Sequence, residues 1–490
     1  MSDSKAEKII RITSIIFAAL LLAGAALYLF VFVNFFKNDA VLSGGEDIVL
    51  YCSRLLAGGY QIYHSSPAID APFCYPMYPP VHYYILVFAH KLFGDSLIVG
   101  RLVCFSFVFV TAAMIGMIAN IRSGNRLAGL AAAGIFLFFH PILVWSGQNR
   151  VDITALMFAV AGALWYFKFE KSRFAYLFSA VFFALAVYSK QTMLACFAAL
   201  VLSLLFSNAK RAVALAATWS ALSLAAFLLL NSITDGGFYF QMFGMHQAPM
   251  LPDRAYALLK MILSDGMFLV FTALALLTSA TRGKLKFETA FALVSWISAS
   301  AALSYYGSSV NYMFETCAAL SLGAGCAVAG FRENKVAKAI VLVLAVAALS
   351  QSVFVNLREI KNIAIVNPRR IEHVRDLKTA ADKLKSRYSS ENMLLYDTME
   401  PALELNWDVR MNYVEYSKIG GVDDDILMRM IRNKQWDAVV MSYDIEKAVD
   451  TYPVAFPKFA REQLEAIDDN YVVDPDFKSN QKSFTLFVPR

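Results

Sequence analysis

Long apolar stretches without charge recur along the chain, and they limit the class of fold that it can adopt. Hydrophobic residues make up 58% of the 490 residues, and the mean hydropathy is +0.52. A helix needs about 20 consecutive apolar residues to cross a bilayer. The composition therefore predicts an α-helical polytopic membrane protein. We expect about 11 transmembrane helices, near residues 12–36, 97–120, 127–145, 152–168, 174–189, 192–207, 212–231, 258–280, 287–304, 311–330 and 338–356.

Basic residues between these spans indicate the orientation of the chain. Cytoplasmic loops carry an excess of Lys and Arg. Here they gather in the N-terminal segment and in alternate connections: Arg122 and Arg126; Lys168, Lys171 and Arg173; Lys210 and Arg211; Arg282, Lys284 and Lys286; Arg332, Lys335 and Lys338. The net charge is +6, but the basic residues sit in short clusters between apolar runs, so no nucleic-acid partner is expected. The other connections and the C-terminal tail are expected in the periplasm or at the exterior of a bacterium, with the protein in its cytoplasmic (inner) membrane.

The N-terminal apolar run is longer than that of a signal peptide and lacks a small-x-small cleavage site, so we interpret it as an uncleaved first span. The composition changes near residue 357, where charged residues become frequent. Beyond it, amphipathic helices expected near 370–388 and 423–435 alternate with short apolar runs: Met393 to Tyr396, Ala438 to Met441, Tyr471 to Val473 and Phe484 to Val488. This pattern predicts a soluble α/β domain over 357–490, a cap or recognition module, after a transmembrane domain over 1–356.

The first outer connection, 37–96, is rich in aromatic residues and proline. Helical spacing runs from Tyr51 to Tyr63, and prolines stop any helix before another resumes at Val81 to Phe93. Such segments suit helices that lie in the membrane interface. Cys52 and Cys74 fall in this connection. They are able to form a disulfide if it faces an oxidising compartment, but the sequence does not give their distance.

Two adjacent carboxylates, Glu46 and Asp47, follow the first span and open a short helical segment. Carboxylates at the edge of a membrane are costly, and they often mark a functional site. Acids that follow glycines also favour the N-terminus of a helix. Capping of the helix that carries Leu50 and Leu55 is therefore the alternative interpretation.

Three further outer connections carry polar and charged residues: Gln148, Asn149, Arg150 and Asp152; Ser189, Lys190, Gln191 and Thr192; and Asn311, Tyr312 and Glu315. The distribution of Lys and Arg disfavours Arg150 and Lys190 on the outer face, so each is expected to have an anionic partner. For either cation alone, an internal salt bridge such as Arg150 with Asp152 is the alternative. Together with Glu46 and Asp47 they predict one site. A second large outer connection, 232–257, includes His246 and is a plausible flap.

This residue set suits the transfer of a sugar from a polyprenyl phosphate. A carboxylate takes the proton from an acceptor hydroxyl as it attacks the anomeric carbon, while Arg and Lys hold the departing phosphate. Arg matches phosphate with a bidentate fork, and Lys supplies a compact charge. The donor keeps its tail among the membrane lipids, which explains a site at the interface.

Several short motifs occur in a fixed order: Glu46-x-x-x-Leu50-Tyr51, Leu56-Ala57-x-Gly59-x-x-x-Tyr63, Tyr78-Pro79-Pro80, Arg150-Val151-Asp152, Lys190-Gln191-Thr192 and Asn311-Tyr312-x-x-Glu315. Over roughly residues 40–330, they resemble the family-39-type membrane glycosyltransferases of the GT-C superfamily. Relatives of that family include lipid A aminoarabinose transferases and protein mannosyltransferases. The resemblance implies an inverting hexosyl- or pentosyltransferase with a polyprenyl-phosphate sugar donor and a lipid, glycan or protein acceptor.

The resemblance also implies roles for individual residues. Glu46 or Asp47 is the catalytic base, and many relatives have glycine at the second position, which favours Glu46. Asp152 is a second catalytic acid. The other implied roles are donor-phosphate binding by Arg150, Lys190 and Gln191, and substrate binding by Tyr78, Asn311, Tyr312 and Glu315. Relatives divide on metal dependence, so either a divalent cation or no cofactor is compatible with these residues.

A membrane transporter or flippase of a lipid-linked or anionic substrate is the alternative function, because charges within membranes also mark substrate paths. The chain shows no inverted repeat, the expected span count is odd, and the charges gather on one membrane face. A lipid scaffold or assembly protein is the third interpretation. It predicts that replacement of Glu46 has no effect.

Overall fold

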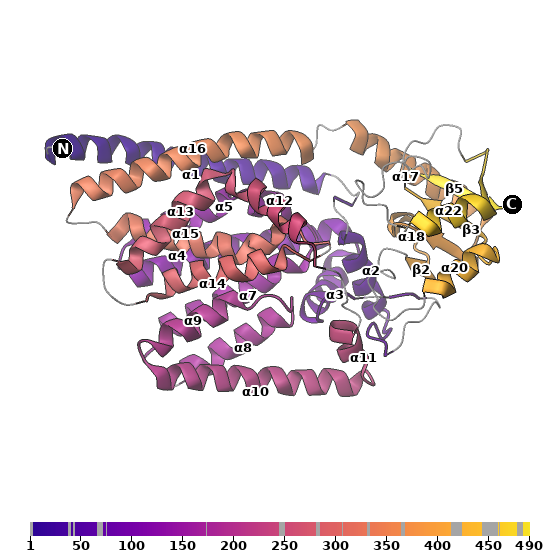
Figure 1. The fold of residues 1–490 in the computed structure, drawn as a ribbon, viewed down its shortest axis with the longest axis horizontal. Helices are drawn as coiled ribbons and strands as arrows, with labels where there is room; N and C mark the ends of the chain where they lie inside the picture. The colour runs from indigo at the N-terminus through magenta and orange to yellow at the C-terminus, as the bar shows by residue number, and fades with distance from the viewer. Residues whose placement is uncertain are drawn as a thin grey trace. The chain divides into compact units, whose positions relative to one another are not determined.

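The computed structural model describes residues 3–37, 41–42, 45–65, 72–74, 76–172, 174–244, 250–280, 285–305, 307–330, 334–363, 368–412, 424–442, 459, 461–477 and 484–490. The chain divides into two compact units (Figure 1). Unit 1 comprises Met1–Asp39, Tyr78–Leu228 and Pro249–Ile365. Unit 2 comprises Ala40–Met77, Leu229–Ala248 and Val366–Arg490.

Unit 1 is built from helices. They are α1 (Asp3–Phe36), α3 (Val81–Phe93), α4 (Leu97–Ser123), α5 (Arg126–Phe138), α6 (His140–Trp145), α7 (Val151–Lys168), α8 (Ala175–Val187), α9 (Ala195–Leu205), α10 (Ala209–Ile233), α12 (Pro252–Leu263), α13 (Gly266–Ala280), α14 (Phe287–Ala302), the 3-10 helix η2 (Val310–Met313), α15 (Phe314–Gly330) and α16 (Lys335–Ile363). The last residues of α10, from Leu229, belong to unit 2.

Helix α15 forms the core of unit 1 and packs on α4, α5, α13 and α14. Small residues allow its neighbours to approach closely, as in many membrane helix bundles. A Cβ atom at Gly325 would lie 2.6 Å from the carbonyl oxygen of Ala128, and one at Gly323 would lie 2.4 Å from the Cβ of Ala275. Large apolar side chains such as Leu127, Ile297 and Phe354 are instead exposed, as expected of a surface that faces lipid.

Six helices among the described residues are long and apolar enough to cross a membrane, or seven if one bent pair counts as a single span. Four shorter apolar helices, of 10–17 residues, accompany them. The structure therefore supports a multi-pass membrane protein, whereas the count of about 11 spans remains a prediction. The segment expected to span at 127–145 breaks at Phe139, before Pro141, into α5 and α6, because proline cannot continue a helix.

The segment expected to span at 258–280 bends by 83° between α12 and α13. Polar side chains of α16 bind the backbone and the Asp265 side chain at this bend. Gly266 N donates to Gln351 Oε1 at 3.1 Å, Gln351 Nε2 donates to Ser264 O at 2.9 Å, and Ser352 Oγ donates to Asp265 Oδ2 at 3.2 Å. Irregular backbone at membrane depth is tolerated where the protein supplies such partners.

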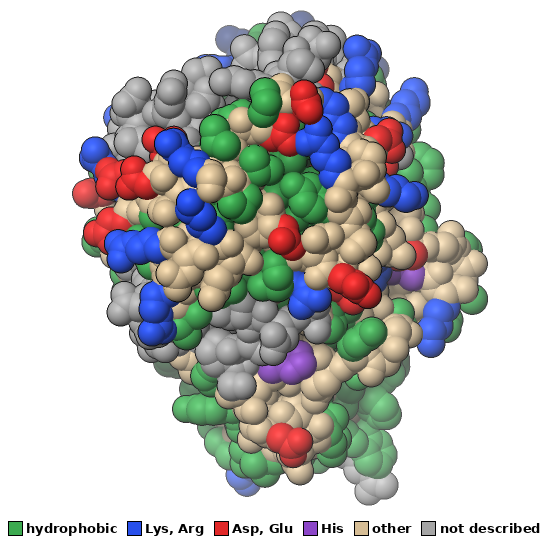
Figure 2. Space-filling model, turned by 90° about the vertical axis from the view of Figure 1, so that its right-hand side faces the viewer, with side chains coloured by type: hydrophobic (Ala, Val, Ile, Leu, Met, Phe, Trp, Pro, Cys, Tyr) green, Lys and Arg blue, Asp and Glu red, His purple; other side chains and the backbone are tan. Residues whose placement is uncertain are grey.

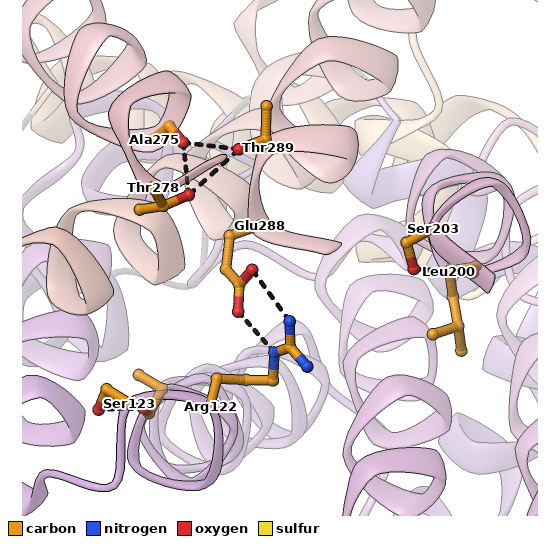
Figure 3. Close-up of polar contacts among 9 residues, drawn as sticks. Arg122, Ser123, Leu200, Ser203, Ala275, Thr278, Glu288 and Thr289 are labelled. Carbon is orange, nitrogen blue, oxygen red and sulfur yellow. Dashed lines mark hydrogen bonds and ion pairs between the residues drawn. The ribbon is translucent and has the colours of Figure 1, made fainter. Parts of the chain in front are cut away.

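An ion pair joins the end of α4 to the start of α14 (Figure 3). Arg122 donates to both oxygens of Glu288, from Nε at 2.6 Å and from Nη2 at 3.3 Å. The guanidinium also lies over the Phe167 ring near the end of α7, 4.9 Å from its centre. Nearby, Thr278 and Thr289 both donate to the carbonyl of Ala275, which links α13 to α14.

Unit 2 contains α2 (Glu46–Ala57), α11 (Gly237–Tyr239), the π-helix η1 (Phe240–Gly244), α17 (Pro368–Arg387), α18 (Glu400–Leu405), α20 (Asp424–Arg432) and α22 (Arg461–Asn470). Its strands are β1 (Leu394–Tyr396), β2 (Met411–Asn412), β3 (Ala438–Met441), β4 (Tyr471–Val473) and β5 (Thr485–Pro489). They form one sheet in the order β2-β1-β3-β5-β4. Strands β2, β1 and β3 are parallel, and β5 and β4 add antiparallel to β3.

The small C-terminal sheet that the sequence predicted is present, and four of its strands lie where the apolar runs placed them. Val439 pairs with Leu395 on one side and with Phe487 on the other, so the middle of the sheet is apolar. Figure 2 shows a face on which acidic and basic side chains are interspersed. The boundary at residue 356 remains a prediction; α16 continues to Ile363.

Candidate active site

Asp152 lies at the centre of a buried cluster in unit 1. It is 2% exposed and stands in the first turn of α7, for which Arg150 is the N-cap residue. Its Oδ1 accepts hydrogen bonds from Lys190 Nζ at 2.5 Å and from Asn311 Nδ2 at 2.8 Å. Its Oδ2 faces Arg150 Nε at 3.6 Å. A buried carboxylate loses its hydration, and here two cations and one amide compensate for that loss.

Both cations of this cluster lie against aromatic rings. Lys190, 2% exposed in the turn between α8 and α9, has its Nζ 4.0 Å from the centre of the Tyr312 ring. The guanidinium of Arg150 lies over Trp145, 5.2 Å from the ring centre. Aromatic faces attract cations, most strongly where water is excluded. The rings therefore stabilise positive charge at a place that bulk water scarcely reaches.

The motif Asn311-Tyr312-x-x-Glu315 supplies three contacts from one short segment. Asn311 binds Asp152, Tyr312 faces Lys190, and Glu315 is close enough to Lys190 to interact electrostatically. The segment spans η2 and the first turn of α15. Because α15 is the core helix, the cluster is tied to the most buried of the six candidate membrane spans among the described residues.

Glu315 has a more specific contact with the start of α9. Its two carboxylate oxygens accept hydrogen bonds from Ala195 N at 3.1 Å and Cys196 N at 2.8 Å. The first N–H groups of a helix have no partner within the helix, and they carry partial positive charge. Glu315 therefore caps α9 from another helix and holds the turn that precedes it, which contains Lys190.

The start of α3 also lies beside the segments that carry the cluster. Val81 N donates to the carbonyl of Tyr188 at 3.0 Å, two residues before Lys190. His82 Nδ1 lies 2.8 Å from Thr154 Oγ1 on α7. Burial raises the pKa of the half-buried Tyr78 phenol, so this hydroxyl remains protonated. Tyr78 also interacts electrostatically with the whole cluster: Arg150, Asp152, Lys190 and Tyr312.

Glu46 and Asp47 open α2 in unit 2. Gly45 before them has a φ of 104°, a conformation that favours glycine. Glu46 Oε2 accepts from Leu42 N at 2.7 Å, and Asp47 Oδ1 accepts from Gly45 N at 3.0 Å. These bonds organise the turn that precedes α2, and neither goes to an N–H group of the helix itself. The carboxylates are also buried, at 0% and 8% exposure, whereas capping by itself does not require desolvation.

The structure brings several of the residues predicted from the sequence into direct contact: Arg150, Asp152, Lys190, Asn311 and Tyr312. Asp152 is the anionic partner expected for both cations. Gln191 is half-buried beside Lys190. Among the other polar residues, Gln148 donates to Val144 O and Ser189 donates to Leu185 O, both within their own turns. His246 lies outside the described residues.

Two buried residues escaped the sequence analysis. His82 is fully buried, and burial lowers the pKa of its imidazole to about 3, so it is neutral. Arg101, one turn into α4, is also fully buried, and its Nη1 donates to the carbonyl of Phe35 at 3.0 Å. An arginine inside an apolar run was the available signal for Arg101. The position of His82 directly after Tyr-Pro-Pro was the signal for His82.

Metal binding was left open by the sequence. Among the residues that the structure describes, no three His, Cys, Asp or Glu side chains lie close enough together to hold a metal ion. Asp152 itself is occupied by Lys190 and Asn311.

Comparison with known proteins places these observations in a family context. A model of the family described as dolichyl-phosphate-mannose-protein mannosyltransferase matches residues 77–233, which include Arg150 and Lys190. No curated protein matched the chain by sequence. The structure of ArnT from Cupriavidus metallidurans is similar, with a TM-score of 0.58 at 14% identity over 96% of this chain and 98% of that one.

Two other solved structures have a similar fold. AglB from Archaeoglobus fulgidus has a TM-score of 0.58 at 12% identity, over 97% of this chain and 74% of that one. AftD from Mycobacteria has a TM-score of 0.51 at 16% identity, over 96% of this chain and 41% of that one. ArnT has been solved bound to undecaprenyl phosphate, and AglB in complex with an inhibitory peptide and a dolichol phosphate.

The matching family and these three neighbours all belong to the GT-C glycosyltransferase superfamily. The chain therefore has the GT-C fold, a helical membrane protein with a small C-terminal sheet. This finding confirms the fold that the resemblance implied.

Proposed function

We propose that this protein is an inverting glycosyltransferase that moves a sugar from a polyprenyl-phosphate-linked donor to a lipid, glycan or protein acceptor at the outer face of the cytoplasmic membrane. The observation that carries the proposal is the convergence of two cations, the half-buried Arg150 and the buried Lys190, on the buried carboxylate of Asp152. The polyprenyl and dolichol phosphates bound to ArnT and AglB support this donor class.

The two cations provide a site for the donor phosphate. Without a donor, Asp152 offsets the repulsion between Arg150 and Lys190 and keeps both in place. When the bond between the anomeric carbon and the phosphate oxygen breaks, the electron pair leaves with the phosphate. Arg150 and Lys190 then stabilise the growing negative charge, which is worth most where water is excluded. Gln191, Tyr78 and Asn311 contribute polar contacts to the substrates in this proposal.

Glu46 is proposed as the base that accepts the proton of the acceptor hydroxyl. Adjacent residues on a helix point about 100° apart, so Glu46 and Asp47 cannot both readily address one hydroxyl. Glu46 has the longer side chain and the position that the family resemblance implies. Asp47, whose Oδ1 accepts from Gly45 N at 3.0 Å, is assigned an orienting role. Both carboxylates serve the same reaction as the Asp152 cluster in this proposal.

The reaction requires a defined orientation of the chain. We propose that residues 37–96 and 357–490 lie outside the cytoplasm, because the basic clusters occupy the alternate connections. Cysteine labelling from either side of the membrane tests this orientation with two variants. Ser390→Cys, at an exposed position of unit 2, should react from outside, and Ser123→Cys should react from inside. Labelling of Ser390→Cys from the cytoplasmic side alone contradicts the proposal.

Binding of a polyprenyl phosphate to the purified protein tests the donor site directly. We expect undecaprenyl phosphate to bind and undecaprenol, which lacks the phosphate, to bind much more weakly. Lys190→Ala should weaken undecaprenyl phosphate binding roughly 30-fold to 1000-fold, since a charge-assisted contact to a buried anion is worth about 2 to 4 kcal/mol. Lys168→Ala, at the exposed far end of α7, is the matched control. Equal binding of both lipids by all three proteins contradicts the proposed site.

Reconstituted vesicles separate transfer from transport. An enzyme releases the sugar from a polyprenyl-phosphate sugar when an acceptor is present. A flippase moves the intact lipid from one leaflet to the other and leaves the sugar attached. Movement without transfer, under conditions in which the lipid binds, would therefore overturn the proposal in favour of the transporter.

A further inference from the structure

Two cysteines of unit 2 lie side by side although 22 positions separate them in the sequence. The Sγ atoms of Cys52 and Cys74 are 3.1 Å apart. Cys52 is on α2 and is fully buried, and Cys74 is 7% exposed. A disulfide bond is about 2.05 Å long, so a displacement of about 1 Å brings the two sulfurs to bonding distance.

Contacts other than the sulfurs hold these two segments in register. Val409 N donates to the hydroxyl of Tyr51, the residue before Cys52, at 2.9 Å. The carbonyl of Val409 accepts from Phe73 N, the residue before Cys74, at 2.6 Å. One fully buried residue therefore binds the neighbour of each cysteine. The folded backbone of unit 2 brings the two sulfurs together by itself, so pairing does not depend on a chance encounter.

We propose that Cys52 and Cys74 form a structural disulfide when unit 2 folds outside the cytoplasm. The inference rests on the proposed orientation, because such bonds persist in oxidising compartments. The two thiols lose two protons and two electrons to a more oxidising protein disulfide, which is reduced to a dithiol through a mixed-disulfide intermediate. The bond joins α2, whose first turn carries Glu46 and Asp47, to the segment that precedes Tyr78.

The other four of the six cysteines provide an internal control. Cys104 lies on α4, Cys196 on α9, and Cys317 and Cys326 on α15. All four are in apolar helices of unit 1, where cysteine behaves as a small hydrophobic residue. They are expected to remain thiols, so the number of alkylated cysteines in the unfolded protein reports the state of the pair.

Alkylation at the moment of cell lysis tests the proposal. Cells are broken in a denaturant with an excess of a thiol-alkylating reagent, and the purified chain is analysed by mass spectrometry before and after reduction. We expect four alkylated cysteines before reduction, six when a reductant precedes the reagent, and one peptide that joins Cys52 to Cys74. Six alkylated cysteines at lysis would overturn the proposal, even if later exposure to air reduces that number to four.

Variants then separate this bond from the proposed function. The double variant Cys52→Ser/Cys74→Ser should melt several degrees lower than the wild type, and a reductant should no longer change its melting temperature. Cys326→Ser, on α15, should keep the response of the wild type to reductant. If Ser390→Cys reports the expected orientation and the trapped chain still carries six thiols, the pairing is wrong and the transferase proposal stands. If the trapped chain carries four thiols but the protein shows no transfer activity, the pairing stands and the transferase proposal is wrong.

Discussion

Two ion-paired regions of unit 1 are tied to opposite ends of α7 and differ in how their charges are matched. At the Lys168 end of α7, Arg122 donates to both carboxylate oxygens of Glu288, from Nε at 2.6 Å and from Nη2 at 3.3 Å. Its guanidinium lies over the ring of Phe167. Near Val151, one carboxylate, that of Asp152, faces two cations. Asp152 and Phe167 are about 22 Å apart along the helix axis, from the rise of about 1.5 Å per residue.

We interpret the first pair as a contact that stabilises the fold, and the second cluster as the phosphate site of the proposed function. A guanidinium that uses two donors on both oxygens of one carboxylate has satisfied that acid. In the Asp152 cluster, Lys190 and Asn311 share Oδ1, while Arg150 approaches Oδ2 only to 3.6 Å. Glu315, the other acid near Lys190, has both oxygens on N–H groups of α9. Arg150, Lys190 and Asp152 by themselves carry a net charge of about +1, which favours an additional anion beside the two cations.

Replacement of the proposed base should have the largest effect on transfer. Glu46→Gln keeps the shape of the side chain and the bond from Leu42 N, but it cannot accept a proton. Loss of a general base lowers rates by about 10² to 10⁴, so single-turnover sugar transfer should fall within that range while donor binding persists. Asp47→Asn is the matched control and should stay partly active. An active Glu46→Gln beside an inactive Asp47→Asn exchanges the two roles, and two fully active variants support a transporter or scaffold.

Removal of one cation from the Asp152 cluster should have the next largest effect. Lys190→Ala or Arg150→Ala should lower transfer per folded molecule roughly 30-fold to 1000-fold, because a contact to the departing phosphate is lost. Arg150→Lys should recover little activity, since the ammonium cannot reproduce the fork. Steady-state transfer is measured beside Lys168→Ala, which should match the wild type. If both alanine variants retain full activity, the donor phosphate binds elsewhere.

Disruption of the Arg122–Glu288 pair should affect stability and leave the chemistry intact. Arg122→Ala leaves Glu288, 2% exposed, without its cation. Breaking a buried pair costs up to about 3 to 5 kcal/mol, and partial exposure of Arg122 places this one near the lower end. Thermal unfolding should shift down, and transfer per folded molecule should remain within about twofold of the wild type. The reversed pair Arg122→Glu/Glu288→Arg should recover part of the lost stability. A large loss of transfer without loss of stability would remove the distinction between the two regions.

Local patterns in the sequence predicted much of this fold. The prolines before Val81 and the apolar spacing after it defined α3 at both ends, Val81–Phe93. Short apolar runs between charged segments located β1, β3, β4 and β5. The two residues of β2 escaped because they are too few to form a pattern. The bend between α12 and α13 escaped because it depends on Gln351, a partner far away in the sequence.

The candidate site could be predicted as a set of residues, and its contacts could not. Charge at the outer ends of expected spans selected Arg150, Asp152 and Lys190. The sequence contains no distances, so the sharing of Asp152 Oδ1 between Lys190 and Asn311 emerges only from the folded chain. Glu315 was predicted to bind substrate. Its bonds to the start of α9 depend on the packing of α9 near α15, which no local pattern encodes.

Substitution of Tyr312 should have the smallest effect on transfer. Two variants at this position separate the role of the ring from that of the hydroxyl. Lys190 Nζ lies 4.0 Å from the ring centre, so Tyr312→Phe keeps the aromatic face and should change transfer by less than about threefold. Tyr312→Leu removes that face, and a desolvated cation–π contact of about 1 to 2 kcal/mol predicts a loss of roughly 5-fold to 30-fold. Steady-state transfer at varied donor concentration measures both. A Tyr312→Phe variant as impaired as Tyr312→Leu would assign the role to the hydroxyl, and Lys190 would then be held by Asp152 rather than by the ring.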